Sequence, residues 1–168
     1  MPQIISVVGN SKSGKTTFIE KLITELTQRK LRVGVIKHTH HGFDADQKGK
    51  DTWRHKKAGA EIVIAAAPGQ IMMLKDDPNS ESIDDLETYF KGLDLVITEG
   101  FKKKNRPKIE IFRPEIHKTP VCLRDPSLVA FVSDSDMDVD VPRFKTDAIR
   151  ELSDFIVDRF VSPRPKTG

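Results

Sequence analysis

Eight consecutive residues near the N-terminus constrain this chain more than any other feature, because they match G-x-x-x-x-G-K-[ST] without a mismatch. The motif runs from Gly9 to Thr16. A β-branched run at residues 4–8 precedes it and predicts a buried strand, and apolar residues at helical spacing follow it. Strand, glycine-rich loop and helix in this order predict a phosphate-binding loop, in which backbone N–H groups and the positive end of the helix meet an anion.

The side chains of this loop have distinct expected roles. Lys15 is expected to neutralise charge between the β- and γ-phosphates and to be the catalytic lysine, the Thr16 hydroxyl to ligate Mg²⁺, and Thr17 to bind the α-phosphate. Lys12 resembles the second loop lysine that, in one branch of phosphate-loop proteins, reaches across a dimer to the partner's phosphates, and an exposed, solvated side chain is the competing interpretation. The predicted nucleotide-binding residues of the loop are Gly9, Asn10, Ser11, Lys12, Ser13, Gly14, Lys15, Thr16 and Thr17.

A magnesium ion at Thr16 needs a carboxylate from the end of a neighbouring strand. The strand predicted over residues 93–98 is followed by Glu99, and ligands of parallel sheets bind at the carboxyl ends of strands, so Glu99 is the predicted metal carboxylate. The loop after the second strand supplies further candidates. Asp51 is predicted to be a magnesium ligand and also to cap a short helix. Asp46 is the alternative candidate, and its predicted catalytic role is to orient a water molecule.

No [NT]-K-x-D guanine signature occurs in the chain. Asp134 follows the strand predicted over residues 128–132 and offers a carboxylate that could accept hydrogen bonds from the ring N–H and the exocyclic amine of guanine. Adenine does not offer this pair of donors. Asp134 is therefore the hypothesis for base recognition.

Two further clusters have open interpretations. The histidines His38, His40 and His41 could contact nucleotide or substrate, bind a transition metal, or belong to a solvated loop. The basic stretch 102–108 follows Glu99 directly, and it could hold an anionic second substrate, meet an acidic patch of a partner, or be a solvated face.

The remaining pattern predicts an α/β fold with a mostly parallel twisted sheet flanked by helices, extended by an antiparallel hairpin around Pro68-Gly69. A single phosphate-loop domain is expected over residues 1–161, with a flexible tail over 162–168. Ser82 and Asp147 are the expected caps of the third and last helices. The other predicted elements are strands at 32–37, 61–67, 70–74, 108–112 and 139–144 and helices at 52–58 and 82–91.

Composition excludes several other classes of protein. The chain has 168 residues with 28 Lys and Arg against 25 Asp and Glu, and a net charge of +3 argues against a dedicated nucleic-acid binder. No apolar run approaches the roughly 20 residues of a membrane-spanning helix, and no basic signal segment opens the chain. The one cysteine, Cys122, excludes an internal disulfide, so the expected compartment is the cytoplasm.

Taken together, these motifs resemble the MobB family of molybdopterin-guanine dinucleotide biosynthesis adaptor proteins. The resemblance covers most of the chain. Its most specific part is the middle segment, because a phosphate loop alone occurs in many families. The segments that carry it are VVGNSKSGKTT, VIKHTHHGFDADQKGKDTWRHKKAGA, DLVITEGFK, PKIEIFR and the closing VPRF.

The resemblance implies a GTP-binding protein with weak Mg²⁺-dependent GTPase activity, as a rule a homodimer. Its implied partner is a MobA-type nucleotidyltransferase that joins GMP to molybdopterin, with molybdopterin itself as a second candidate. Related dethiobiotin synthetase-like enzymes share the loop threonine, mid-chain aspartate and E-G glutamate. This likeness supports Thr16, Asp51 and Glu99 as the magnesium set.

Two alternative functions compete with this interpretation. A dethiobiotin-synthetase-like small-molecule kinase or ligase would form nucleoside diphosphate rapidly only when a small acceptor is added. A metal-delivery GTPase would bind zinc or nickel stoichiometrically through His38, His40 and His41.

Overall fold

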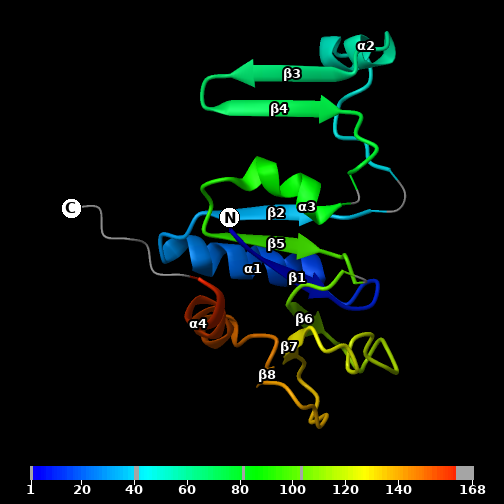
Figure 1. Ribbon diagram of the computed structural model, residues 1–168. Helices are drawn as coiled ribbons and strands as arrows, with labels where there is room; N and C mark the ends of the chain where they lie inside the picture. The colour runs from blue at the N-terminus through cyan, green and yellow to red at the C-terminus, as the bar shows by residue number, and fades with distance from the viewer. Residues whose placement is uncertain (1, 40–41, 81, 103, 162–168) are drawn as a thin grey trace, which may run out of the picture. The chain divides into compact units, whose positions relative to one another are not determined.

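The computed structural model describes residues 2–39, 42–80, 82–102 and 104–161, and the chain divides into two compact units. Met1–His38 and Glu87–Gly168 form the first unit, and Thr39–Leu86 forms the second (Figure 1). The single domain expected over residues 1–161 stays a prediction. The expected tail over 162–168 lies outside the described residues.

A six-stranded sheet forms the first unit, in the order β2-β5-β1-β6-β7-β8, and every neighbouring pair is parallel. This confirms the predicted α/β class. Because β1 is central, its carboxyl end meets those of β5 on one side and β6 on the other. The strands are β1 (Gln3–Val8), β2 (Val33–Lys37), β5 (Leu95–Glu99), β6 (Lys108–Ile111), β7 (Leu128–Val132) and β8 (Arg143–Phe144).

Helices α1 (Lys15–Gln28) and α4 (Ile149–Phe160) pack together in the first unit and contribute to one apolar core with the sheet (Figure 1). The apolar stripe predicted for each helix faces this core, as the period of 3.6 residues requires. The buried members of the two stripes are Phe18, Ile19, Leu22, Leu26, Leu152 and Ile156.

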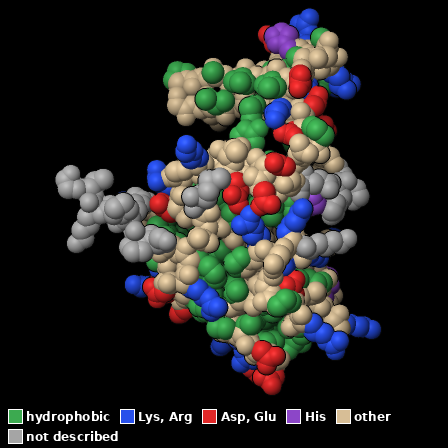
Figure 2. All heavy atoms as spheres, viewed as in Figure 1, with side chains coloured by type: hydrophobic (Ala, Val, Ile, Leu, Met, Phe, Trp, Pro, Cys, Tyr) green, Lys and Arg blue, Asp and Glu red, His purple; other side chains and the backbone are tan. Residues whose placement is uncertain are grey.

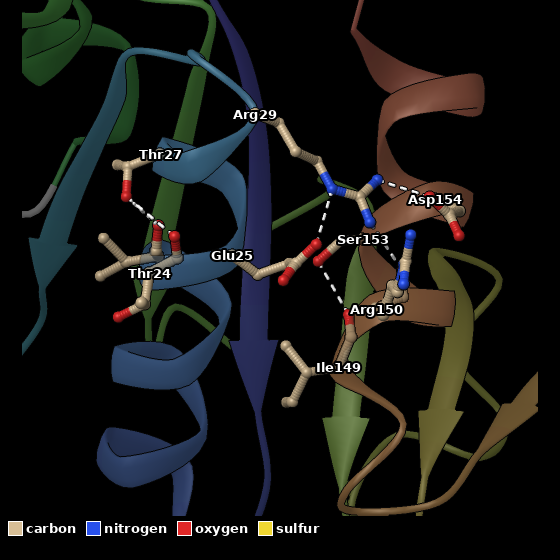
Figure 3. A network of polar contacts seen from close by, with 9 residues as sticks. Thr24, Glu25, Thr27, Arg29, Ile149, Arg150, Ser153 and Asp154 are labelled. Carbon is tan, nitrogen blue, oxygen red and sulfur yellow. Dashed lines mark hydrogen bonds and ion pairs between the residues drawn. The ribbon is translucent and has the colours of Figure 1, made fainter.

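A polar network joins the outer edges of these two helices (Figure 3). The guanidinium of Arg29 lies between two carboxylates, with Nε 2.9 Å from Glu25 and Nη1 2.5 Å from Asp154, and Nη2 donates to the carbonyl oxygen of Arg150 at 3.1 Å. Asp154 is largely exposed, so solvent screens this pair. Its contribution to stability is therefore expected to be small.

Several expected boundaries are wrong at helix ends. Asp51 is the first residue of α2 (Asp51–Lys57) and not its cap, because Lys50 occupies the N-cap position. Asp147 does not cap α4 either. A tight turn closes with the N–H of Ile149 donating to the carbonyl oxygen of Asp147 at 2.8 Å, and this moves the N-cap to Ala148, which provides no side-chain cap.

Two other elements are shorter than expected. Of the strand expected over 139–144, only Arg143–Phe144 pairs with β7. The helix expected over 82–91 is a single turn, α3 (Ile83–Leu86), followed by the 3-10 helix η1 (Glu87–Phe90). The hydroxyl of Ser82 accepts a hydrogen bond from the N–H of Asp85 at 3.4 Å, as expected of a cap.

The second unit contains the predicted hairpin of β3 (Ile62–Ala67) and β4 (Gln70–Lys75) (Figure 1). The register pairs Ala67 with Gln70 across the turn. No helix in the described part of the chain is long and apolar enough to cross a membrane.

Candidate nucleotide-binding site

The loop between β1 and α1 has the backbone that a phosphate cradle needs. Gly9 has φ +149°, and a Cβ there would lie 2.4 Å from the carbonyl oxygen of Ile111, so this loop passes directly against β6. Gly14, the N-cap residue of α1, has φ +84° and has no side chain that could accept a hydrogen bond from the helix. The N–H groups of the first helical turn therefore have no side-chain acceptor at the N-cap and can meet an anion.

Lys15 closes the loop on itself, because its Nζ donates to the carbonyl oxygen of Asn10 at 2.7 Å. Burial lowers the pKa of Lys15, Glu99 acts in the opposite sense, and Lys102 lowers the pKa further. A half-buried ammonium group inside a glycine-rich loop of this kind supplies the positive charge that an anion site would need.

The structure brings together Thr16 and Glu99, the two predicted metal ligands of the first unit. The Thr16 hydroxyl donates to Oε1 of Glu99 at 3.1 Å across 83 residues of sequence. The sheet explains this contact, since β5 pairs with β1 in a parallel register that sets Glu99 beside Val7, two residues before Gly9. The predicted position of Glu99 at the carboxyl end of its strand is the observed one.

A segment that the sequence analysis did not single out lies against the same loop. We name residues 113–119, which follow β6, the β6 loop. The Nε2 of His117 donates to the carbonyl oxygen of Ser11 at 2.8 Å, and Asn10 Nδ2 donates to the carbonyl oxygen of Thr119 at 3.0 Å. The guanidinium of Arg113 lies over Gly14, 3.3 Å from the position of a Cβ.

Glu110, a fully buried carboxylate in β6, anchors the chain just beyond this loop. It accepts hydrogen bonds from the N–H groups of Val121 at 2.5 Å and Cys122 at 2.8 Å. Burial raises the pKa of Glu110, and these two hydrogen bonds oppose that shift. A carboxylate between two isoleucines of the predicted strand 108–112 was the sequence signal for this anchor.

The basic stretch 102–108 is partly structural. Lys108 is 1% exposed, forms an ion pair with Asp125 at 2.9 Å and donates to the carbonyl oxygen of Lys104 at 2.7 Å. Arg106 pairs with Glu87 at 2.7 Å. Lys103 lies outside the described residues.

Comparison with known proteins places this site in a family. The family model described as molybdopterin guanine dinucleotide synthesis protein B, MobB, matches residues 4–134, which include the phosphate loop, Glu99, the β6 loop and Asp134. The chain belongs to the MobB family. It is a MobB-family adapter protein of molybdopterin guanine dinucleotide biosynthesis, as the resemblance of its motifs predicts.

The similarity to relatives and to solved structures extends over nearly the full length of this chain. The chain is 39% identical over 155 residues to the molybdopterin-guanine dinucleotide biosynthesis adapter protein of Haemophilus influenzae, covering 91% of this chain and 86% of that protein. The Escherichia coli adapter protein is 34% identical over 165 residues, covering 94% and 93%. A crystal structure of molybdopterin-guanine biosynthesis protein B superposes with TM-score 0.71 at 32% identity, covering 92% and 97%.

In this MobB-family chain, Asp134 is held by a second loop. Its Oδ1 accepts the N–H of Thr146 at 2.9 Å and its Oδ2 accepts the Thr146 hydroxyl at 2.5 Å, and these bonds lower the pKa of Asp134. Asp134 also lines a cavity of about 210 Å³ with Arg113 and Glu115. Its contact with guanine stays a prediction.

Asp46 and Asp51 belong to the second unit. The Asp51 side chain is 85% exposed and lies 3.6 Å from Arg54. Oδ1 of Asp46 accepts the N–H of Gln47 at 2.8 Å, and Oδ2 is buried without a hydrogen-bond partner among the described residues. The metal role of Asp51 and the catalytic role of Asp46 stay predictions.

The histidine cluster is only partly described. The N–H of His38 donates to the carbonyl oxygen of Glu99 at 3.0 Å, and its ring packs against Phe101 with centroids 4.4 Å apart. His40 and His41 lie outside the described residues. Within the described ranges, no group of three or more His, Cys, Asp or Glu side chains could hold a metal ion.

Proposed function

We propose that this chain binds GTP with Mg²⁺ at the phosphate loop and, in this form, assists a MobA-type nucleotidyltransferase that attaches GMP to molybdopterin. The observation that carries the proposal is the contact of Thr16 with Glu99 at 3.1 Å, a hydroxyl and a carboxylate brought together from α1 and β5. Family membership supports the pathway, and the loop geometry supports the ligand.

The residues present fit both groups. Hydroxyl and carboxylate oxygens are the ligands that Mg²⁺ prefers, and Thr16 and Glu99 offer one of each. Lys15 offers a positive charge to the phosphates, and the glycine backbone leaves room for close approach. Ser13 Oγ is buried in the same loop without a hydrogen-bond partner among the described residues, as a donor reserved for a ligand would be.

Each side chain then has a defined part in the chemistry. The magnesium ion, when bound, neutralises phosphate charge, with Thr16 and Glu99 as the residues that would hold it. Lys15 exchanges its contact with Asn10 for phosphate oxygens. Nucleotide occupancy, with slow hydrolysis, is the proposed signal to the partner enzyme, and Asp134 is the proposed reader of guanine.

Glu99→Gln tests the metal half of this proposal. The variant keeps the size of the side chain and removes the charge that a cation needs. The ratio of GTP affinity in Mg²⁺ to GTP affinity in EDTA is therefore expected to be about 10-fold smaller than in the wild type. Calorimetric titration with GTP in Mg²⁺ and in EDTA measures this difference. Glu20→Gln, the same change on an exposed part of α1, serves as the control. Equal Mg²⁺ dependence of Glu99→Gln and wild type would contradict the proposal.

We further propose that the functional form is a homodimer and that the hairpin of the second unit contributes to its interface. Figure 2 shows hydrophobic side chains gathered on this hairpin. Four of them are 41 to 73% exposed on one face of the two strands, as the register places Ile64 opposite Met73 and Ile71 opposite Ala66. An exposed apolar face of this kind marks a protein interface. The four residues are Ile62, Ile64, Ile71 and Met73.

The double variant Ile64→Lys with Ile71→Lys tests the homodimer. Two charges on the apolar face are expected to convert the dimer to monomer, with a dissociation constant raised at least about 100-fold, because each buried lysine costs several kcal/mol. Sedimentation velocity measures the oligomeric state. Leu123→Lys, at an exposed apolar residue of the first unit, is the control. A dimer of unchanged strength in the double variant would exclude the hairpin from the interface.

Family membership favours this adapter function over the kinase or ligase and the metal-delivery GTPase considered from sequence. We place the protein in the cytoplasm. Its one cysteine, Cys122, is a buried free thiol whose pKa burial raises to about 11, which suits a reducing compartment.

A further inference from the structure

Arg113, the first residue of the β6 loop, presents an exposed guanidinium beside the phosphate loop. No hydrogen bond or ion pair engages this guanidinium within residues 2–39, 42–80, 82–102 and 104–161. Hydrogen bonds from Thr146 lower the pKa of Asp134, and the charge of Arg113 acts in the same direction. An arginine with all five N–H donors available, next to a proposed anion site, can bind an anionic ligand.

The guanidinium lies flat over Gly14. Its Nη2, Cζ and Nε atoms are 3.3, 3.5 and 3.5 Å from the position of a Cβ at Gly14, and such equal distances mean that the plane of the group faces the glycine. Because guanidinium N–H bonds lie in the plane of the group, the donors of Arg113 are directed across the surface of the loop and not into Gly14. Gly14 leaves the space that this arrangement needs.

The surrounding contacts hold Arg113 in place without using its side chain. The carbonyl oxygen of Arg113 accepts the N–H groups of Ile116 at 3.1 Å and His117 at 3.0 Å, which makes a compact turn. His117 and Asn10 tie this turn to the phosphate loop, and the buried carboxylate of Glu110 fixes the segment beyond it. The guanidinium is therefore presented by a preorganised backbone.

The sheet order determines which part of a nucleotide Arg113 can reach. Glu99 comes from β5, on one side of β1, and Arg113 follows β6, on the other side. Thr16 and Glu99, the residues that would hold a magnesium ion and supply its charge to the terminal phosphates, lie on the β5 side. The β6 side, with the cavity that Arg113 shares with Asp134, is left for the α- and β-phosphates and the nucleoside.

We infer that Arg113 is a nucleotide-binding residue supplied by the chain itself, which contacts the α- and β-phosphate oxygens from the side opposite the metal. This inference rests on the proposed function and adds a second cation to Lys15. Arginine suits the role, because its fork of parallel donors matches phosphate oxygens and it stays charged at every physiological pH.

Arg113→Gln tests the inference by calorimetric titration with GTP and GDP in Mg²⁺. The variant is expected to lose affinity for both nucleotides by the same factor, about 10-fold to 100-fold, since charged hydrogen bonds to phosphate are removed and the γ-phosphate is not involved. Arg113→Lys is expected to recover part of the loss. The melting temperature is expected to stay unchanged, because no described fold contact uses this guanidinium.

Arg124→Gln is the control, since it makes the same charge change at an exposed residue leading into β7. Unchanged affinity of Arg113→Gln for both nucleotides would overturn the inference, and so would a loss confined to GTP. Binding of neither nucleotide by the wild type would overturn the proposed function as well. The wild-type titration thus separates the failure of this inference from failure of the proposal on which it rests.

Discussion

Gly9→Ala is expected to destabilise the protein by about 3 kcal/mol or more and to abolish nucleotide binding. The added Cβ would lie 2.4 Å from the carbonyl oxygen of Ile111 and 2.9 Å from Ser13 Oγ. The first contact is with the backbone of Ile111, the last residue of β6, and β6 is held between β1 and β7, so this backbone cannot move aside as a flexible side chain could. The φ of +149° adds strain for any residue with a side chain. Urea unfolding and titration with GTP measure the two effects.

The chain offers a matched control for this variant. Gly49 has φ +93°, also unfavourable for alanine, but a Cβ there meets nothing within 4 Å. Gly49→Ala is therefore expected to cost only about 1 kcal/mol of backbone strain. If Gly9→Ala cost no more than Gly49→Ala, the close approach of the loop to β6 would not be a feature of the folded protein.

Lys15→Met is expected to weaken GTP binding at least about 100-fold, because two or more charged hydrogen bonds to phosphate are lost while the length of the side chain is kept. The same change is expected to leave stability unchanged or raised. Burial lowers the pKa of Lys15, so its charged form is disfavoured in the folded protein, and a neutral side chain removes that cost.

Calorimetric titration and thermal unfolding of Lys15→Met separate binding from folding. Lys21→Met, at an exposed residue of α1, controls for the loss of one positive charge. Retention of GTP affinity in Lys15→Met would contradict a phosphate role for the loop, even if the variant folds normally.

The sequence is sufficient to locate the phosphate loop and Glu99, because both depend on local order. A strand, a loop and a helix follow one another around Gly9, and the carboxyl end of any parallel strand beside β1 lies near that loop. The hairpin is predicted for a similar reason, since Pro68-Gly69 separates two apolar runs that are close in sequence.

The contacts of the β6 loop could not be predicted in this way. Asn10 and Thr119 are 109 residues apart, and nothing in either neighbourhood marks the other. The partner of Asp134 was missed because Thr146 follows a strand of only two paired residues, Arg143–Phe144, too short to show a pattern. Asp147 resembled a cap by residue type, but cap formation depends on the turn that precedes the helix.

The placement of β1 at the centre of the sheet has a consequence for synthesis on the ribosome. Gln3 pairs with Leu95 and Ser6 pairs with Lys108. During synthesis β1 therefore has no partner strand until about a hundred further residues have been made. Such distant pairing slows folding and leaves early apolar segments in need of protection. A nascent chain that ends before β5 has the whole glycine motif in its sequence, yet neither neighbouring strand against which to shape it.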